Sequence, residues 1–522
     1  MAIQYFFLLL LVFSAVCSHG ARHMPFSIIN LDKNTGKSYK MFDEKDLTRN
    51  DFPKNFAFGT ATSAFQIEGV THRGFNIWDS FTHRYPEKST DGSYGDIAAD
   101  SYHLYKTDVK MMKDMGADAY RFSIAWSRIL PNGRINGEIN KEGIQYYKNL
   151  IDELLANDIE PFVTIFHWDV PQTLEDMYGG LLDRNFVSHY RDFANLCFKE
   201  FGDKVKYWIT FNQPYSLGFN AYGKGEQAPG RCSSWMNKNC TGGDSGTEPY
   251  IVAYHELIAH AEVVQLYRRE YKEIQRGHIG ITLVANWFWP LTDTKADIDA
   301  AQRAQDFKLG WFLDPIMFGD YPASMKELVG KRLPQFAPWE SELIKGSIDF
   351  IGLNYYFPLF AYNKPTPDPK KPSVLTDGRF GTIDNRDGVM IGINSTLFCY
   401  NATGFYDLLT YMRNKYNNPL IYITENGYAD SSAISLNETL TDVGRIDYYQ
   451  AHIAVLKQAI DEGSNIAGYF AWSLLDNYEF VQGFSVRFGL HYLDYKNPSD
   501  RRPKASALWF TDFLNPDSKE VA

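Results

Sequence analysis

The sequence predicts an α/β fold, a single (β/α)8 barrel of the TIM type with extended loops at the strand ends. Short runs of β-branched and aromatic residues alternate with longer helical patterns, which is typical of a parallel sheet wound with helices. Eight such strand candidates occur along the 522 residues, and no low-complexity linker separates them. Eight alternations favour a closed barrel over an open sheet, and closed α/β barrels often exceed the usual domain size as one unit.

The expected strands are short apolar runs. They cover residues 56–59, 119–124, 161–166, 207–211, 279–283, 350–353, 420–424 and 466–470. Helical stripes lie between them, one over residues 144–155 and another over 446–460, the latter closed by Gly463 at a C-cap position. In a barrel of this kind the chemistry belongs at the C-terminal strand ends, so we expect the functional residues directly after each run.

The chain is expected to begin with a signal peptide at residues 1–20. Residues Tyr5 to Cys17 are apolar, small residues follow, and the run is too short to span a bilayer comfortably. An N-terminal extension at 21–51, the barrel domain at 52–514 and a tail at 515–522 complete the expected organisation. No later apolar run of about 20 residues occurs, so no membrane anchor is expected. The sequence therefore predicts the secretory pathway, with the vacuole or the extracellular space as the destination.

Cysteines and sequons agree with that compartment. Cys232 and Cys240 lie in a loop rich in Gly, Ser and Asn, which suits a local disulfide. Four acceptor sites favour a glycosylated surface, and they are Asn239, Asn394, Asn401 and Asn437. The formal net charge of −11 argues against nucleic acid as a partner. An aromatic content of 16% suits either a large core or a cleft that stacks sugar rings.

Polar side chains follow six of the eight expected strands. They are Gln66 and Glu68; His167, Trp168 and Asp169; Asn212 and Gln213; Asn354, Tyr355 and Tyr356; Glu425 and Asn426; and Trp472, Asp476, Asn477, Glu479 and Phe480. A single polar residue at a strand end usually caps a helix or starts a turn. Carboxylate, amide, imidazole and indole groups that converge from six strands indicate a binding site instead.

The residue types at these strand ends suit a sugar. Amide, imidazole and carboxylate groups supply the mixed donors and acceptors that hydroxyls need, and an indole offers an apolar face for the ring. No Gly-rich phosphate loop accompanies the strands, which weakens a nucleotide interpretation. The His and carboxylate residues lack a metalloprotease-type spacing, so no catalytic metal is expected.

Several motifs resemble the signatures of glycoside hydrolase family 1. They stand at residues 65–69, 121–128, 166–169, 210–214 and 423–427, and the resemblance runs from about 52 to 514. Such a resemblance implies a retaining mechanism on β-D-glycosides, with two carboxylates about 5–5.5 Å apart. Glu425 matches the nucleophile. The general acid/base, which normally follows the Asn on the fourth strand, is replaced here by Gln213.

Gln213 changes the chemistry that is expected. An amide neither donates a proton to a leaving group nor deprotonates water at neutral pH. The chain resembles myrosinases, plant thioglucosidases that carry Gln at this position and act on glucosinolates. The resemblance implies release of glucose and an unstable thiohydroximate-O-sulfate from a small-molecule β-thioglucoside, with no required cofactor and ascorbate as the activating base. Two alternatives stay open: a β-O-glucosidase or transglucosidase for activated glucosides, and a non-catalytic glucoside-binding pseudoenzyme.

The same resemblance assigns roles to the remaining site residues. Glucose would be held by Gln66, His167, Asn212, Trp472 and Glu479. Tyr356 would hydrogen-bond Glu425. Arg121 on the second strand would lie beneath the nucleophile and help to hold its charge; a buried structural ion pair is the alternative interpretation, and both can be true together. Phe480 and Phe488 would line the aglycone side, with plain packing as the alternative for both.

Two further features bear on partners and substrate. His83 and Asp96 resemble the stretch where some myrosinases hold a structural zinc across a dimer axis, which implies a homodimer. The alternative is that both are solvated surface residues, because two ligands per chain make a zinc site only if a partner chain supplies the others. Asn220 and Asn286 stand where well-known myrosinases carry arginines for the sulfate. Lys224 or Arg231 could supply the positive charge, and a plain surface position in a loop is the favoured alternative for both.

Overall fold

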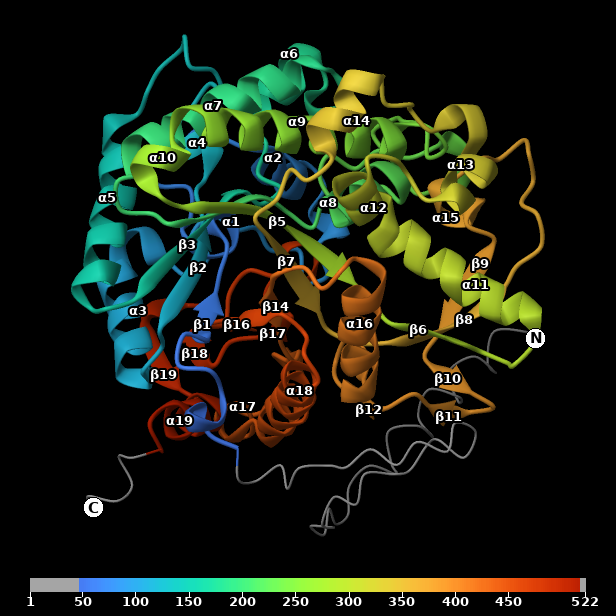
Figure 1. The fold of residues 1–522 in the computed structure, drawn as a ribbon. Coiled ribbons are helices and arrows are strands. Elements are labelled where there is room, and N and C mark those ends of the chain that lie inside the picture. The colour runs from blue at the N-terminus through green and yellow to red at the C-terminus, as the bar shows by residue number, and fades with distance from the viewer. Residues whose placement is uncertain (1–46, 517–522) are drawn as a thin grey trace, which may run out of the picture. The chain divides into compact units, whose positions relative to one another are not determined.

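The eight expected strands close into one parallel barrel, which confirms the predicted fold class (Figure 1). In the computed structural model the barrel strands are β1 (Ala57–Ala61), β2 (Ala119–Ser123), β3 (Glu160–Phe166), β4 (Tyr207–Asn212), β5 (His278–Ala285), β7 (Phe350–Tyr355), β14 (Ile421–Asn426) and β16 (Ile466–Trp472). Their order round the barrel is β1-β16-β14-β7-β5-β4-β3-β2, and every neighbouring pair is parallel.

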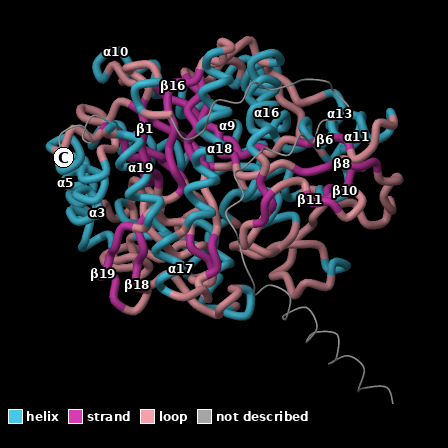
Figure 2. Tube along the Cα trace, turned by 90° about the horizontal axis from the view of Figure 1, so that it is seen from below, coloured by secondary structure: helices cyan, strands magenta, loops and turns pink. Residues whose placement is uncertain are grey.

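A helix follows each barrel strand and covers the outside of the sheet. These helices are α3 (Ser101–Met115), α5 (Lys141–Ala156), α7 (Asn185–Phe201), α9 (Glu248–Glu270), α12 (Trp311–Phe318), α16 (Ala402–Lys415), α18 (Val443–Asp461) and α19 (Ala505–Leu514). Seen from below, the strands lie inside and helices such as α3 and α5 lie outside (Figure 2). The side chain of Asn140 caps the N-terminus of α5, and Gly463 follows α18 with a φ of 96° that favours glycine.

The structure describes residues 47–516. The predicted signal peptide, the predicted extension up to residue 46 and the tail from residue 517 lie outside the described residues. The last part of the extension carries a short 3-10 helix, Arg49–Asp51, and Arg49 lies 3.5 Å from the carboxylate of Asp118, which directly precedes β2. No helix of the described residues is long and apolar enough to cross a membrane.

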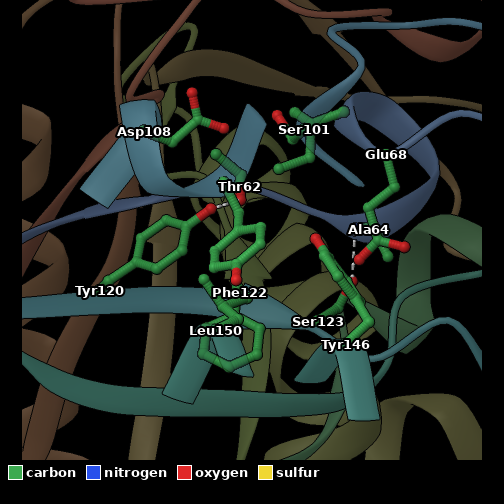
Figure 3. A pocket seen from close by; sticks show the side chains of 12 residues that line it. Thr62, Ala64, Glu68, Ser101, Asp108, Tyr120, Phe122, Ser123, Tyr146 and Leu150 are labelled. Carbon is green, nitrogen blue, oxygen red and sulfur yellow. Dashed lines mark hydrogen bonds between the residues drawn. The ribbon is translucent and has the colours of Figure 1, made fainter. Parts of the chain in front are cut away.

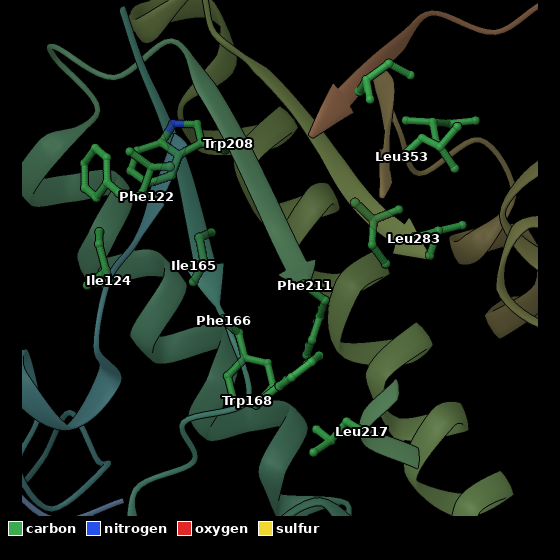
Figure 4. Close-up of a cluster of buried hydrophobic side chains, with 14 of the residues drawn as sticks. Phe122, Ile124, Ile165, Phe166, Trp168, Trp208, Phe211, Leu217, Leu283 and Leu353 are labelled. Atoms are coloured by element: carbon green, nitrogen blue, oxygen red, sulfur yellow. The ribbon is translucent and has the colours of Figure 1, made fainter. Parts of the chain in front are cut away.

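The core fills two regions. Aromatic and aliphatic side chains pack between the strands and the outer helices, and Figure 4 shows Phe166, Trp208 and Phe211 in this layer around β3 and β4. A second cluster fills the barrel interior, where the Phe162 and Tyr207 rings stack 4.1 Å apart. Burial of each such side chain contributes about 1.5–3 kcal/mol. The barrel interior is therefore a packed core and not a pore.

The loops beyond the strand ends carry their own structure. A three-stranded sheet of β6 (Phe288–Pro290), β8 (Leu359–Asn363) and β9 (Phe380–Ile383) packs against α11 (Lys295–Gln305). The loop after β4 contains the predicted disulfide between Cys232 and Cys240, whose Cα atoms lie 5.6 Å apart. Cys197 and Cys399 are buried free thiols.

Candidate active site

Glu425 lies at the C-terminal end of β14, and three donors hold its carboxylate. Arg121 Nη1 donates to Oε1 over 2.5 Å, while Tyr356 Oη and Gln213 Nε2 donate to Oε2 over 2.7 and 3.2 Å. Burial, followed by the charge of Glu425, raises the pKa of Tyr356 well above its usual value. The phenol therefore stays protonated and donates. The carboxylate is therefore held by three donors, each from a residue in or directly after a different barrel strand.

Arg121 contacts Glu425, the predicted nucleophile, and it is fully buried. Its Nη2 donates to Asn212 Oδ1 over 2.8 Å and its Nε donates to Thr164 Oγ1 over 3.1 Å. A buried charge of this kind is tolerated only when paired and hydrogen-bonded, and Glu425 supplies the counter-charge. One interaction therefore accounts for both predictions for Arg121, the structural ion pair and the contact with Glu425.

The orientation of Asn212 fixes the protonation of His167. Asn212 Oδ1 accepts from Arg121 and, over 3.0 Å, from Asn354 Nδ2, so its amide nitrogen must face His167 Nε2, 2.9 Å away. His167 Nε2 therefore accepts, and the imidazole proton lies on Nδ1. Burial, and then the charge of Arg121, lower the pKa of His167 well below its usual value. Nδ1 has no partner among the described residues, so a neutral imidazole presents one donor to a hydroxyl.

Gln66 and Glu479 form a second part of the site and are hydrogen-bonded to each other. Gln66 lies in α1 (Ala64–Ile67) after β1, and its Nε2 donates to Glu479 Oε2 over 3.1 Å and to Asn477 Oδ1 over 3.0 Å. Burial, and then the charge of Glu425, raise the pKa of Glu479 to about 8. Trp472 completes this part, with its ring 6.1 Å from that of His167 and nearly parallel to it.

The segment that carries Gln66 is anchored from behind. Ala64 N donates to Ser123 Oγ over 2.7 Å, and Ser63 Oγ donates to Gln66 Oε1 over 2.7 Å. Behind α1 lies a cavity of about 10 Å³, lined by both polar and apolar side chains, among them Ser101, Asp108 and Phe122 (Figure 3). A cavity of that size has room for about one water molecule. The two hydrogen bonds therefore hold the segment that presents Gln66 in place.

The aromatic residues expected on the aglycone side lie in different surroundings. Phe480 is buried against Trp78, Trp168 and Phe65, with ring centroids 4.6, 4.8 and 5.8 Å away. Phe488 lies edge-on to Tyr356 at 6.1 Å. Phe480 thus makes packing contacts, which the sequence left open as the alternative to an aglycone role. The aglycone role of both residues stays a prediction.

The sequence missed two residues that support the site. Thr164 Oγ1 accepts from the guanidinium of Arg121, and Ser216 Oγ donates to Gln213 Oε1 over 3.0 Å. Asn354, predicted at a strand end without a role, donates to the amide oxygen of Asn212 over 3.0 Å. Trp168, noted in its motif without a role, donates from Nε1 to the carbonyl of Asn212 over 2.8 Å. Each stands on or just after a barrel strand, but their spacing gives no signal of which partner they contact.

The residues predicted for zinc binding, for positive charge and for glycosylation make contacts of their own. His83 Nε2 lies 3.0 Å from Asp96 Oδ1, and the described residues contain no group of three or more His, Cys, Asp or Glu that could hold a metal, so the zinc and the homodimer stay predictions. Arg231 is paired with Glu248. The Asn239, Asn394 and Asn437 side chains are exposed, whereas Asn401 is partly buried.

Comparisons with known proteins agree with the arrangement. Residues 48–518 match the family model of glycosyl hydrolase family 1. Beta-glucosidase 12 of Oryza sativa subsp. indica is 52% identical over 485 residues, which are 91% of this chain and 95% of that protein.

Solved structures give the same result. A mutant of the rice Os3BGlu6 beta-glucosidase, solved in a covalent complex with glucose, is similar with a TM-score of 0.88 and 46% identity over 90% of this chain and 99% of that one. An aphid myrosinase is similar with a TM-score of 0.80 and 37% identity, over 88% of this chain and 98% of that one.

Proposed function

The chain belongs to glycosyl hydrolase family 1, and from that membership we propose that it is a retaining β-glucosidase for glucosides whose aglycone departs without a proton. One observation carries the proposal. The group that faces the Glu425 carboxylate across the site is the amide of Gln213, 3.2 Å away, where a retaining enzyme places a second carboxylate. A carboxamide supplies no proton, so the leaving group must be a stable anion.

In the first step Glu425 attacks the anomeric carbon of the glucoside. A bond forms between that carbon and a carboxylate oxygen, and the bond to the aglycone breaks, with its electron pair leaving on the aglycone. Arg121 and Tyr356 hold the carboxylate in one orientation throughout. Gln66, Glu479 and the Nδ1 proton of His167 would bind the sugar hydroxyls. The covalent glucose described for the rice beta-glucosidase mutant supports such an intermediate here.

The second step releases glucose to water. Water attacks the anomeric carbon, the bond to Glu425 breaks, and the carboxylate is restored. Gln213 takes no proton from the water. We therefore propose that a weak-acid anion from solution, for which ascorbate is the expected candidate, removes that proton.

Activated O-glucosides lead as the substrate class because the relatives that support the family are described as beta-glucosidases. Thioglucosides are a second candidate. The amide at Gln213 favours them, since a thiolate stabilised by a sulfated thiohydroximate needs no proton. Asn220 and Asn286, in place of sulfate-binding arginines, weigh against them. The thioglucosidase hypothesis from the sequence therefore becomes the second candidate.

A panel of leaving groups tests the proposal. We expect kcat/KM to fall steeply from dinitrophenyl to nitrophenyl to alkyl β-glucosides, because no acid compensates for a poorer leaving group. A dinitrophenyl 2-deoxy-2-fluoroglucoside should label Glu425, as located by peptide mass spectrometry, and the Glu425→Gln protein is the matched control. Equal rates on alkyl and dinitrophenyl glucosides would contradict the proposal.

The same panel separates the other hypotheses. A glucosinolate, assayed with and without ascorbate, decides the thioglucoside candidate. Transfer of glucose to added alcohols in preference to water indicates a transglucosidase. Saturable binding of glucose analogues, without turnover or labelling of Glu425, indicates a sugar-binding pseudoenzyme.

We also propose passage through the secretory pathway. The disulfide between Cys232 and Cys240 supports it, because such bonds persist in oxidising compartments. A fluorescent fusion that retains residues 1–20, compared with one that lacks them, tests it in plant cells. Accumulation of both fusions in the cytosol would contradict the proposal.

A further inference from the structure

The amide of Gln213 has a defined orientation in the resting site. An ionised carboxylate only accepts hydrogen bonds, so the atom that faces Glu425 Oε2 must be the amide nitrogen. The amide oxygen then faces Ser216, whose hydroxyl donates to it over 3.0 Å. In this orientation Gln213 holds the nucleophile and presents only donors to the site.

Backbone hydrogen bonds hold Ser216 beside the Gln213 amide. Gln213 has a φ of 45°, and its backbone N–H donates to the carbonyl of Thr282 over 2.9 Å. The N–H of Ser216 in turn donates to the carbonyl of Gln213 over 2.9 Å, which forms the first turn of α8 (Pro214–Ser216). The Ser216 side chain is buried, so its hydroxyl cannot turn to bulk solvent instead. The contact between the two side chains is built into the backbone.

The second chemical step reverses what the site requires of Gln213. Once Glu425 is esterified, its negative charge is gone and it no longer requires the amide nitrogen. The attacking water carries hydrogens and needs an acceptor, and the amide oxygen is the acceptor that Gln213 has. Rotation of the amide by half a turn brings that oxygen toward the site and the nitrogen toward Ser216. A hydroxyl accepts as readily as it donates, so Ser216 satisfies both orientations.

We propose that Ser216 is a positioning residue that lets the Gln213 amide hold the nucleophile in the first step and the hydrolytic water in the second. This inference rests on the proposed function. In the second step the water oxygen bonds to the anomeric carbon, and the electron pair of the broken ester bond returns to Glu425. The water proton passes to a weak-acid anion from solution, and Gln213 accepts a hydrogen bond without taking the proton.

The test separates the two steps by pre-steady-state kinetics on dinitrophenyl β-glucoside. In Ser216→Ala we expect kcat/KM, which reports glycosylation, to stay within about 3-fold of the parent protein, because Arg121 and Tyr356 still hold Glu425 when the Gln213 amide is less well placed. We expect kcat, which reports deglycosylation, to fall about 10-fold, with a burst near one equivalent. These sizes follow from leaving a buried amide without one partner. Azide attacks without losing a proton, so it should bring the kcat of both proteins to the same value.

Three controls make the result specific. Ser216→Thr keeps the hydroxyl and should keep kcat, and Ser216→Cys, a weaker donor and acceptor, carries the test if the Ala variant does not fold. Ser347, a buried serine that donates to Ile344 O, gives a matched Ser347→Ala variant for general packing effects.

Two results would overturn the inference: an equal fall of kcat/KM and kcat in Ser216→Ala, or no change in either. If the parent protein neither turns over the glucoside nor forms covalent glucose on Glu425, the proposed function fails first and the role of Ser216 falls with it.

Discussion

Replacement of Gln213 by glutamate should convert the site into one that cleaves ordinary glucosides. The change is isosteric and puts a carboxyl group where the amide nitrogen now lies 3.2 Å from Glu425 Oε2. Two carboxylates so placed repel each other. At about 5 Å between charge centres and an effective dielectric constant of about 20, the repulsion is about 3 kcal/mol.

That repulsion decides the protonation of the new carboxyl. About 3 kcal/mol corresponds to about 2 pKa units, which raises the pKa of a glutamate from about 4.3 to between about 6 and 7. The group at position 213 would thus be protonated at pH 6 and ready to donate. General acid catalysis contributes typically about 10²–10⁴-fold. We expect kcat/KM for an alkyl β-glucoside to rise at least about 100-fold, and that for dinitrophenyl β-glucoside to change by less than about 5-fold.

The assay compares both substrates between pH 5 and 8. The Gln213→Glu protein should lose alkyl glucosidase activity as pH rises through about 6–7, because the acid ionises. Gln213→Asn keeps an amide and provides the control, with no gain expected. The reasoning is refuted if Gln213→Glu is folded, as judged by its Tm, and its alkyl glucosidase activity equals that of the parent protein.

Three further predictions concern stability and modification. Burial, and then the charge of Glu425, raise the folded-state pKa of Glu479 to about 8. The folded state therefore binds more protons than the unfolded state between about pH 4.5 and 8, and stability falls as pH rises through that window. In Glu479→Gln this loss of stability should shrink, as measured by Tm against pH, and an unchanged slope would contradict the prediction. Arg121→Met leaves the buried carboxylate of Glu425 without its counter-charge and should lower the free energy of unfolding in urea by about 3–5 kcal/mol. Adding Glu425→Gln should recover part of that stability, and no recovery would count against the ion pair as the cause. Asn401 should carry no glycan, because its Nδ2 donates to Ile391 O over 3.0 Å while its Oδ1 caps α16. Glycopeptide mass spectrometry tests this prediction. Equal occupancy of Asn401 and the exposed sequons would disprove it.

The barrel was predictable because its signal is local. Runs of β-branched and aromatic residues specify strands, and apolar stripes specify helices, over windows shorter than 20 residues. The predicted strand at 207–211 and the observed β4 (Tyr207–Asn212) differ by one residue. The cluster of site residues followed from the barrel, because parallel strands end on the same face.

The surroundings of single side chains were less predictable. Phe480 follows Glu479, a residue expected to bind the sugar, yet its ring packs between Trp78 and Trp168, which come from other parts of the chain. Such contacts depend on how distant loops meet. The sequence pattern around Phe480 reads equally well as a cleft wall or as packing.

By itself, the sequence determined the fold and predicted a site at the strand ends that includes Glu425 and Gln213, because strand periodicity and short motifs are properties of neighbouring residues. Only the tertiary structure decided that the Gln213 amide donates to the same carboxylate as Arg121 and Tyr356, that the His167 proton lies on Nδ1, and that Ser216 contacts the Gln213 amide. These interactions join side chains of different strands. Hydrogen bonds form only at about 3 Å with suitable angles, so they are fixed by the closed barrel and not by spacing along the chain.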